Sequence, residues 1–146
     1  MKKIRDQFYL TEYHNRKKFG ITGNSHNRFG TSQYNTGGFD NTVGILYFNL
    51  QGYSGHTSYL EKLVKRELFD YLIRSEKNPN KVLEYVNPKF DHVDIEYMRQ
   101  VVEKLIVQHK LKIKRLKSVF LPSVQMDKDF VSKVRENPEK YLEEIA

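Results

Sequence analysis

The densest run of charge in the chain is the segment KLKIKRLK at residues 110–117, which contains no acid. Its five cations are Lys110, Lys112, Lys114, Arg115 and Lys117. If the segment is a strand, the first three share one face and the last two lie on the other. Such a face can bind phosphate groups, with a salt dependence that grows with each contact. The alternative is a solvated edge strand, in which lysines guard against aggregation.

A second candidate nucleic-acid site lies near the N-terminus, where cations and aromatic rings are interleaved with glycine. The motifs are RKKFG at residues 16–20 and NRFG at residues 27–30. The candidate contacts within them are Arg16, Lys17, Lys18, Phe19, Arg28 and Phe29. Bases of a single strand stack on such rings while cations follow its backbone. The same motifs also suit docking on a neighbouring subunit, or folding of this segment over the protein's own body.

Residues suited to catalysis or metal binding occur only at ordinary density. His92 and Glu96 have the i, i+4 spacing of helical metal ligands, but no third ligand accompanies them. Asp91, Asp94 and Glu96 are carboxylates of the kind that a nuclease uses, although acids are favoured at any helix start. The segment GFDNTVG at residues 38–44 lacks the lysine of a phosphate-binding loop. We therefore expect a non-enzymatic protein with no metal ion, cofactor or small-molecule substrate.

Charge and composition narrow the class of partner. The chain has 146 residues and a net charge of +7, which favours polyanions such as nucleic acid. It has no cysteine, so a disulfide framework and a thiolate metal site are excluded. No apolar run is long enough for a secretion signal or a membrane span, so we expect a cytoplasmic, virion or organellar-matrix protein with no membrane partner. Abundant residues with A/T-rich codons indicate an AT-rich genome, such as that of a low-GC bacterium, one of its phages or an organelle.

Glycine and proline divide the chain into two unlike parts. All eight glycines precede residue 56, and all four prolines follow residue 78. Residues 1–42 show no lasting periodicity and few aliphatic side chains, which predicts an extended basic arm. This arm contains seven aromatic residues that a merely solubilising tail would lack: Phe8, Tyr9, Tyr13, Phe19, Phe29, Tyr34 and Phe39. Residues 43–146 are predicted to form the folded body.

The first half of the body is predicted to be a strand followed by helices. The run VGILYFNL at residues 43–50 has the length and composition of a buried strand. A helix is expected over residues 58–76, where Ser58 and Glu61 match a capping box and leucines recur at helical spacing. Residues 81–86 are predicted to form a short helix.

The second half is predicted to begin with another long helix, capped by Asp91 or Asp94. Its apolar stripe is Ile95, Met98, Val102, Leu105, Ile106 and His109. Alternation then predicts an amphipathic strand over residues 111–121 that pairs with residues 43–50, although a helix continuing through Lys117 is an alternative. A helix near residues 127–136 and a final turn from Asn137 complete the chain.

These elements predict an α+β fold: a helix-rich single domain with a small sheet of two or three strands and an extended glycine- and aromatic-rich N-terminal arm. The order of helix, short helix, helix and basic strand is also compatible with a winged helix. The predicted function is that of a small basic component of a nucleoprotein or virion assembly, whose arm contacts nucleic acid and neighbouring protein subunits. The alternatives are a free phage- or organelle-encoded DNA- or RNA-binding regulator, and a nuclease-type enzyme.

Overall fold

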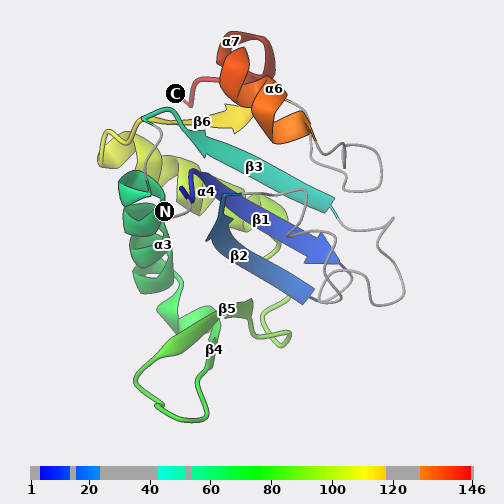
Figure 1. Cartoon of the computed structure of the whole chain (residues 1–146). Helices are drawn as coiled ribbons and strands as arrows, with labels where there is room; N and C mark the ends of the chain where they lie inside the picture. Colours follow the sequence, from blue (N-terminus) through cyan, green and yellow to red (C-terminus); the bar gives the residue numbers. More distant parts are fainter. Residues whose placement is uncertain (1–3, 14–15, 24–42, 52–53, 118–128, 146) are drawn as a thin grey trace.

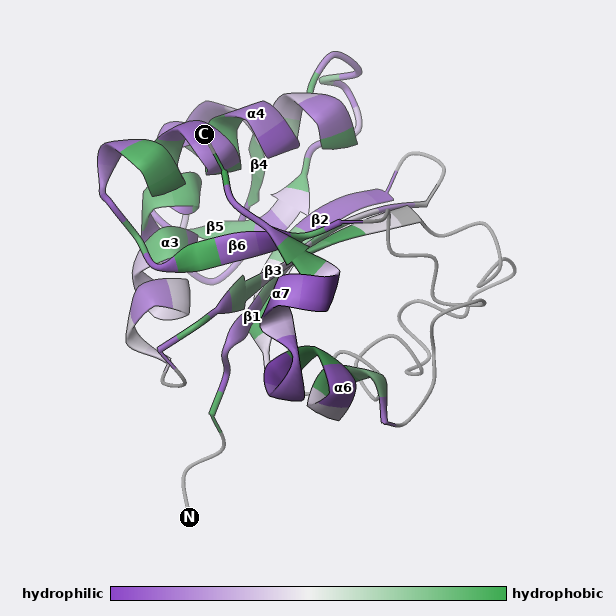
Figure 2. Ribbon diagram, turned by 90° about the horizontal axis from the view of Figure 1, so that it is seen from above, coloured by the Kyte–Doolittle hydropathy of each residue, from purple (hydrophilic) through white to green (hydrophobic). Residues whose placement is uncertain are grey.

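The computed structural model describes residues 4–13, 16–23, 43–51, 54–117 and 129–145. Seven strands within these residues form one antiparallel sheet. Helices pack on both faces of the sheet (Figure 1, Figure 2). The architecture is therefore α+β, with the sheet as the middle layer.

The strands follow the order β4-β5-β2-β1-β3-β6-β7 across the sheet. Their bounds are β1 Gln7–Tyr13, β2 Arg16–Thr22, β3 Val43–Asn49, β4 Leu72–Arg74, β5 Val82–Val86, β6 Ile113–Leu116 and β7 Leu142–Glu143. β1 pairs along its whole length with β2, and from Gln7 to Glu12 with β3. β5 joins β2 through a single pair, Lys18 with Tyr85. The continuous centre of the sheet is therefore made by β2, β1 and β3.

The prediction of a small sheet with an extended N-terminal arm was wrong. β1 and β2 come from the part of the chain assigned to the arm, yet they lie in the middle of the sheet. β1 is buried on both faces, because Phe8 and Leu10 enter one hydrophobic cluster and Tyr9 enters the other. A strand covered on both faces lacks the alternation of apolar and polar residues that marks a half-exposed strand. Residues 24–42 of the predicted arm lie outside the described residues.

Two pairs of helices cover the two faces of the sheet. α3 (Gly55–Glu67) and α4 (Ile95–Gln108) lie on one side, and α6 (Phe130–Glu136) with α7 (Pro138–Tyr141) lies on the other, as Figure 2 shows. The cluster beneath α3 and α4 includes Phe8, Leu10, Phe19, Tyr47, Leu60, Val64, Met98, Val102 and Ile113. The cluster beneath α6 is smaller and consists of Tyr9, Leu46, Phe48, Leu116, Val131, Val134 and Leu142. The arm's aromatic residues Phe8, Tyr9 and Phe19 thus belong to the core.

The strand predicted at residues 43–50 is confirmed as β3. Its predicted pairing with residues 111–121 is confirmed as the β3–β6 ladder, although β6 spans only Ile113–Leu116 and residues 118–121 lie outside the described residues. The helix predicted over residues 58–76 was wrong at both ends. It runs from Gly55 to Glu67 and is followed by a 3-10 turn and by β4. The short helix predicted at residues 81–86 was also wrong, because this segment is β5. Leucines spaced four apart fit a helix, but here Leu72 enters a strand.

The helix predicted to follow Asp91 or Asp94 is confirmed as α4, with Asp94 as its cap. The Asp94 carboxylate accepts a hydrogen bond from the backbone N–H of Tyr97 at 2.8 Å. Met98, Val102, Leu105 and Ile106 of the predicted apolar stripe are buried. The winged-helix alternative was wrong, since β4 and β5 separate the two long helices and the N-terminal hairpin forms the sheet's centre.

Polar contacts attach the helices to the first strand. The side chain of Thr57, in the first turn of α3, donates to the carbonyl oxygen of Arg5. On the other face, Arg135 of α6 makes a bidentate pair with the buried carboxylate of Asp6, at 2.7 and 2.9 Å. The predicted helix near residues 127–136 is confirmed as α6, and Pro138 begins α7. In the described part of the chain, no helix is both long and apolar enough to cross a membrane.

Candidate nucleic-acid interface

The structure separates the predicted basic cluster at residues 110–117. Lys110 lies in the turn after α4, with a positive φ of 52°, and Lys110 and Lys112 are exposed. Lys114 and Arg115 lie on β6 with their side chains on opposite faces. Lys114 pairs with Glu144 at 3.7 Å, and Lys117 donates to the carbonyl oxygen of Glu139 at 3.2 Å. Lys110 and Lys112 follow α4 directly, and the backbone N–H of Lys112 donates to Nδ1 of His56 in α3 at 3.1 Å.

The candidate contacts of the N-terminal motifs are also separated. Arg16 is exposed at the start of β2, while Phe19 is fully buried in the core. Lys17 is buried, and its ammonium donates to the carbonyl oxygen of Phe90 at 3.2 Å. Lys18 is buried too, with its ammonium 4.8 Å from the centre of the Tyr85 ring. The structure thus places these three neighbours inside the fold, and Arg28 and Phe29 lie outside the described residues.

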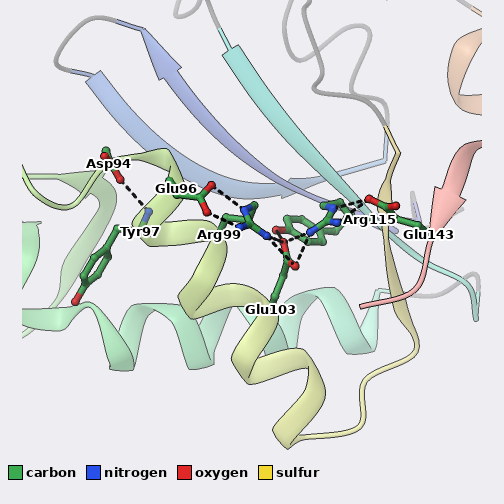
Figure 3. Close-up of polar contacts among 8 residues, drawn as sticks. Asp94, Glu96, Tyr97, Arg99, Glu103, Arg115 and Glu143 are labelled. Carbon is green, nitrogen blue, oxygen red and sulfur yellow. Dashed lines mark hydrogen bonds and ion pairs between the residues drawn. The ribbon is translucent and has the colours of Figure 1, made fainter. Parts of the chain in front are cut away.

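Arg115 belongs to a network of charged groups between α4 and the sheet (Figure 3). Its guanidinium bridges Glu103 of α4 and Glu143 of β7, with contacts of 2.5 to 3.1 Å. Glu103 also accepts hydrogen bonds from the Tyr47 hydroxyl at 2.9 Å and from Arg99 at 3.2 Å. Burial opposes the charge on Arg115, but the two carboxylates outweigh it and raise the pKa of the guanidinium. Each charged group of the network thus has an oppositely charged partner within the protein. We interpret the network as a set of contacts that fastens α4 to the sheet.

Tyr47 cannot act as a base in this network. Burial raises the pKa of its hydroxyl well above the usual value, and the adjacent charge of Glu103 raises it further. The hydroxyl therefore stays protonated and serves as a hydrogen-bond donor.

Of the residues considered for metal or nuclease chemistry, Asp91 is exposed, and Asp94, Glu96 and His92 make other contacts. Asp94 caps α4, and Glu96 forms an ion pair with Arg99. The His92 ring packs against aromatic rings. Among the described residues, no group of three or more histidine, aspartate or glutamate side chains is placed to hold a metal ion.

On the outer side of the α3–α4 layer, aromatic and charged side chains contact one another along the two helices. At one end of the two helices, the rings of Tyr59 and His109 meet edge-to-face at 5.6 Å. In the middle, Lys104 of α4 pairs with Glu67 of α3 at 3.0 Å. At the other end, the rings of Tyr71 and Tyr97 meet at 6.3 Å. These three contacts define a seam between the helices, which we call the α3–α4 seam.

Cations extend from the Tyr59 end of this seam along α3. Lys62 and Arg66 follow Tyr59 by three and seven positions, which places all three on one face of α3. All three side chains are exposed, and the ring of Tyr59 is 46% accessible. Lys110 and Lys112 add two exposed cations directly after α4. We call Tyr59, Lys62, Arg66, Lys110 and Lys112 the Tyr59 surface.

The cations of the Tyr59 surface differ from those of β6 in their surroundings. Lys114 and Arg115 lie within 4.0 Å of carboxylates, whereas no described carboxylate lies at that distance from the side chains of Lys62, Arg66, Lys110 or Lys112. Cations beside an exposed aromatic ring form a surface that attracts phosphates and offers a flat apolar face. Part of the protein's net positive charge is therefore concentrated at this end of the α3–α4 layer.

Sequence reasoning found Lys110 and Lys112 but missed Tyr59, Lys62 and Arg66 as part of the same surface. The i, i+3, i+7 spacing of a ring and two cations was visible in the sequence. Their closeness to residues 109–112 was not, because it depends on how α3 packs against α4. The sequence matches no protein-family model, and comparisons with curated proteins and with solved structures find no match.

Proposed function

We propose that the protein is a small, non-enzymatic nucleic-acid-binding component of a nucleoprotein or virion assembly, and that it binds through the Tyr59 surface. The observation that carries this proposal is the exposed ring of Tyr59, held by His109 and flanked by exposed cations with no described carboxylate at ion-pair distance. The predicted role of an extended arm is not retained, since β1 and β2 are core strands. The net charge of +7 agrees with a polyanionic partner.

The chemistry of the surface suits the backbone of DNA or RNA. Four cations can contact phosphates, which position a strand without reading its sequence. The Tyr59 ring can stack on a sugar or a base. We therefore expect binding with little sequence preference, as befits an assembly component in a virion, the cytoplasm or an organellar matrix.

A free DNA- or RNA-binding regulator is the alternative that this surface also fits. The two roles differ in sequence preference, because a regulator must distinguish its target from competing sites. Competition between unrelated sequences of one length and strandedness separates them. Equal competition supports the assembly role, and a preference of 1,000-fold or more, the order typical of specific binding, supports the regulator.

The proposal is tested by binding across a salt series. If all four cations contact a single strand, the slope of log affinity against log salt is about −2.8, or roughly a 50-fold loss between 50 and 200 mM salt. The double variant Lys62→Ala/Arg66→Ala should halve this slope to about −1.4, so that the loss becomes roughly 7-fold. Fluorescence anisotropy with a labelled oligonucleotide measures both quantities.

The matched control is the double variant Lys77→Ala/Lys81→Ala. Both residues are exposed in the loop between β4 and β5, so this variant loses the same two charges elsewhere. It should keep the wild-type slope. Equal effects of the two double variants, or the absence of binding at 50 mM salt, would show that the Tyr59 surface is not the site.

A further inference from the structure

The far end of the α3–α4 seam carries a second group of rings. Tyr71, Phe90 and Tyr97 surround the imidazole of His92, with ring centres 5.4, 6.3 and 5.7 Å from it in that order. Tyr71 also meets Phe90 edge-to-face at 5.1 Å, and the rings of Tyr71 and Tyr97 meet at 6.3 Å. We call these four residues the His92 cluster.

The His92 cluster is only partly explained by core packing. Tyr71, Phe90 and Tyr97 are half-buried and contact the main hydrophobic cluster. His92 is exposed, so an aromatic surface remains open to solvent where the three other rings meet it. The ammonium of Lys89 lies 5.1 Å from the centre of the Phe90 ring and adds a cation beside this surface.

The distance between the two ring groups suits a short nucleic-acid strand. Tyr97 and His109 lie near opposite ends of α4, which places them about 18 Å apart along its axis. A single strand stacked as in a duplex, at roughly 3.4 Å per nucleotide, covers that distance with about five nucleotides. Lys62 and Arg66 of α3 and Lys104 of α4 lie along the two helices that connect the groups.

We infer that the protein prefers single-stranded nucleic acid, and that one strand stacks a base on Tyr59 and another on the His92 cluster. This inference rests on the proposed function and specifies its ligand. A duplex hides the faces of its bases inside the stack, whereas a single strand can turn them towards aromatic rings. Two ring groups joined by cations therefore favour the single strand, while cations alone would bind either form.

The test measures affinity for labelled oligothymidylates of three, six, nine and twelve nucleotides, and for a duplex of twelve base pairs. Oligomers long enough to reach both ring groups should bind at least 10-fold more tightly than the trimer. The twelve-nucleotide single strand should also bind more tightly than the duplex at equal salt. A fluorescent base analogue such as 2-aminopurine should be quenched when it stacks.

The diagnostic variant is His92→Ala, which removes an exposed ring and leaves the half-buried ones. It should weaken binding of the longer oligomers by about 5- to 30-fold, as expected for the loss of one stacked base, and leave the trimer and the salt slope unchanged. The control His92→Phe keeps a flat ring and should retain the affinity. Circular dichroism of both variants reports whether the fold is kept.

The outcomes separate the inference from the proposed function. Salt-dependent binding that is equal for single strand and duplex, with no effect of His92→Ala, would keep the proposed function and overturn the inference. An equal loss in His92→Ala and His92→Phe would show that stacking is not the role of this ring. The absence of any salt-dependent binding would overturn both.

Discussion

Among individual residues, Tyr47 combines deep burial with a direct contact to a carboxylate. Its hydroxyl donates to Glu103 at 2.9 Å, and burial foremost raises the pKa of this hydroxyl well above its usual value. The unfolded chain loses that proton near pH 10, but the folded chain keeps it. The folded state then binds more protons, so stability is fully present below pH 10 and falls as the pH rises above it.

We therefore predict that the variant Tyr47→Phe is less sensitive to alkali than the wild type. Near pH 8 the variant should lose about 1–2 kcal/mol of unfolding free energy, because one buried hydrogen bond is removed. Above pH 10 the wild type should lose up to about 1.4 kcal/mol per pH unit relative to the variant. Urea unfolding at pH 8, 10 and 11 measures this difference, and parallel pH profiles would refute the assignment.

Gly20 is a second residue whose identity the packing demands. A Cβ at this position in β2 would lie 2.6 Å from the hydroxyl oxygen of Tyr9 and 2.8 Å from the ring carbon that bears it. Tyr9 is 1% exposed and cannot swing out of the way. The Tyr9 ring thus covers the glycine, which explains how a central strand tolerates it.

Replacement of Gly20 by alanine should cost about 1–3 kcal/mol of unfolding free energy through overpacking. If the Tyr9 ring is the cause, Gly20→Ala should cost at least about 1 kcal/mol less in a Tyr9→Leu background. A double-mutant cycle by urea unfolding measures this coupling. Additive effects would mean that the strain arises elsewhere.

Residue types alone were a poor guide to the candidate site. Lys17 and Lys18 have the composition of a phosphate-binding motif, but they lie in a central strand and are buried. Each pairing that removes them from the surface, with Phe90 and with Tyr85, spans more than 60 residues of sequence. No local pattern contains that information. By contrast, the cap at Asp94 was predictable, because a capping contact spans only three residues.

At the level of elements, two carboxylates accept from the first backbone N–H groups of α4: Glu12 of β1 from Ile95 at 3.2 Å, and Asp94 from Tyr97 at 2.8 Å. Asp94→Ala should remove the hydrogen bond to the backbone N–H of Tyr97 and lower the unfolding free energy by about 1 kcal/mol. Asp94→Asn should restore most of it, since asparagine is also a good cap. The matched control is Asp91→Ala, which removes an exposed acid at the other predicted cap position. Equal losses for Asp94→Ala and Asp91→Ala in thermal or urea unfolding would point to general charge effects.

The elements that were predicted correctly can be recognised from the residues within them. β3 is a dense apolar run and α4 has both a cap and an apolar stripe. The elements that were missed conflict with local preference. β2 contains two lysines and a glycine, and β4 continues a leucine spacing that fits a helix. In each case tertiary packing outweighs the preference of the segment.

For the whole molecule, the position of β1 and β2 makes the N-terminus essential to folding. We predict that a chain lacking residues 1–23 does not fold, because β3 loses its partner β1 and β5 loses its partner β2. The sequence had suggested the opposite, a body that stays folded without residues 1–42. Loss of chemical-shift dispersion in the amide NMR spectrum of the truncated chain tests this. A dispersed spectrum would contradict it, and recovery on addition of a peptide of residues 1–23 would support it further.

The overall topology could not be predicted from the sequence because it depends on long-range pairing. The predicted pairing of β3 with the basic segment is confirmed, since these were the two strands predicted in a body of helices. The remaining order could not be derived once β1 and β2 were taken for an arm. The predicted α+β class is correct, but the predicted sheet of two or three strands was too small, since the sheet has seven.

The ion pair of Asp6 with Arg135 bears on how the chain folds as it is made. It joins residues 129 positions apart, and Asp6 directly precedes β1, which is central to the sheet. At a synthesis rate of about 5–20 residues per second, roughly 6 to 26 seconds separate the two residues. During that time Phe8, Tyr9 and Leu10 have already left the ribosome. The helix α6, which covers one face of their strand, has not yet been made. The N-terminal hairpin of the nascent chain therefore needs protection by chaperones until α6 has been made.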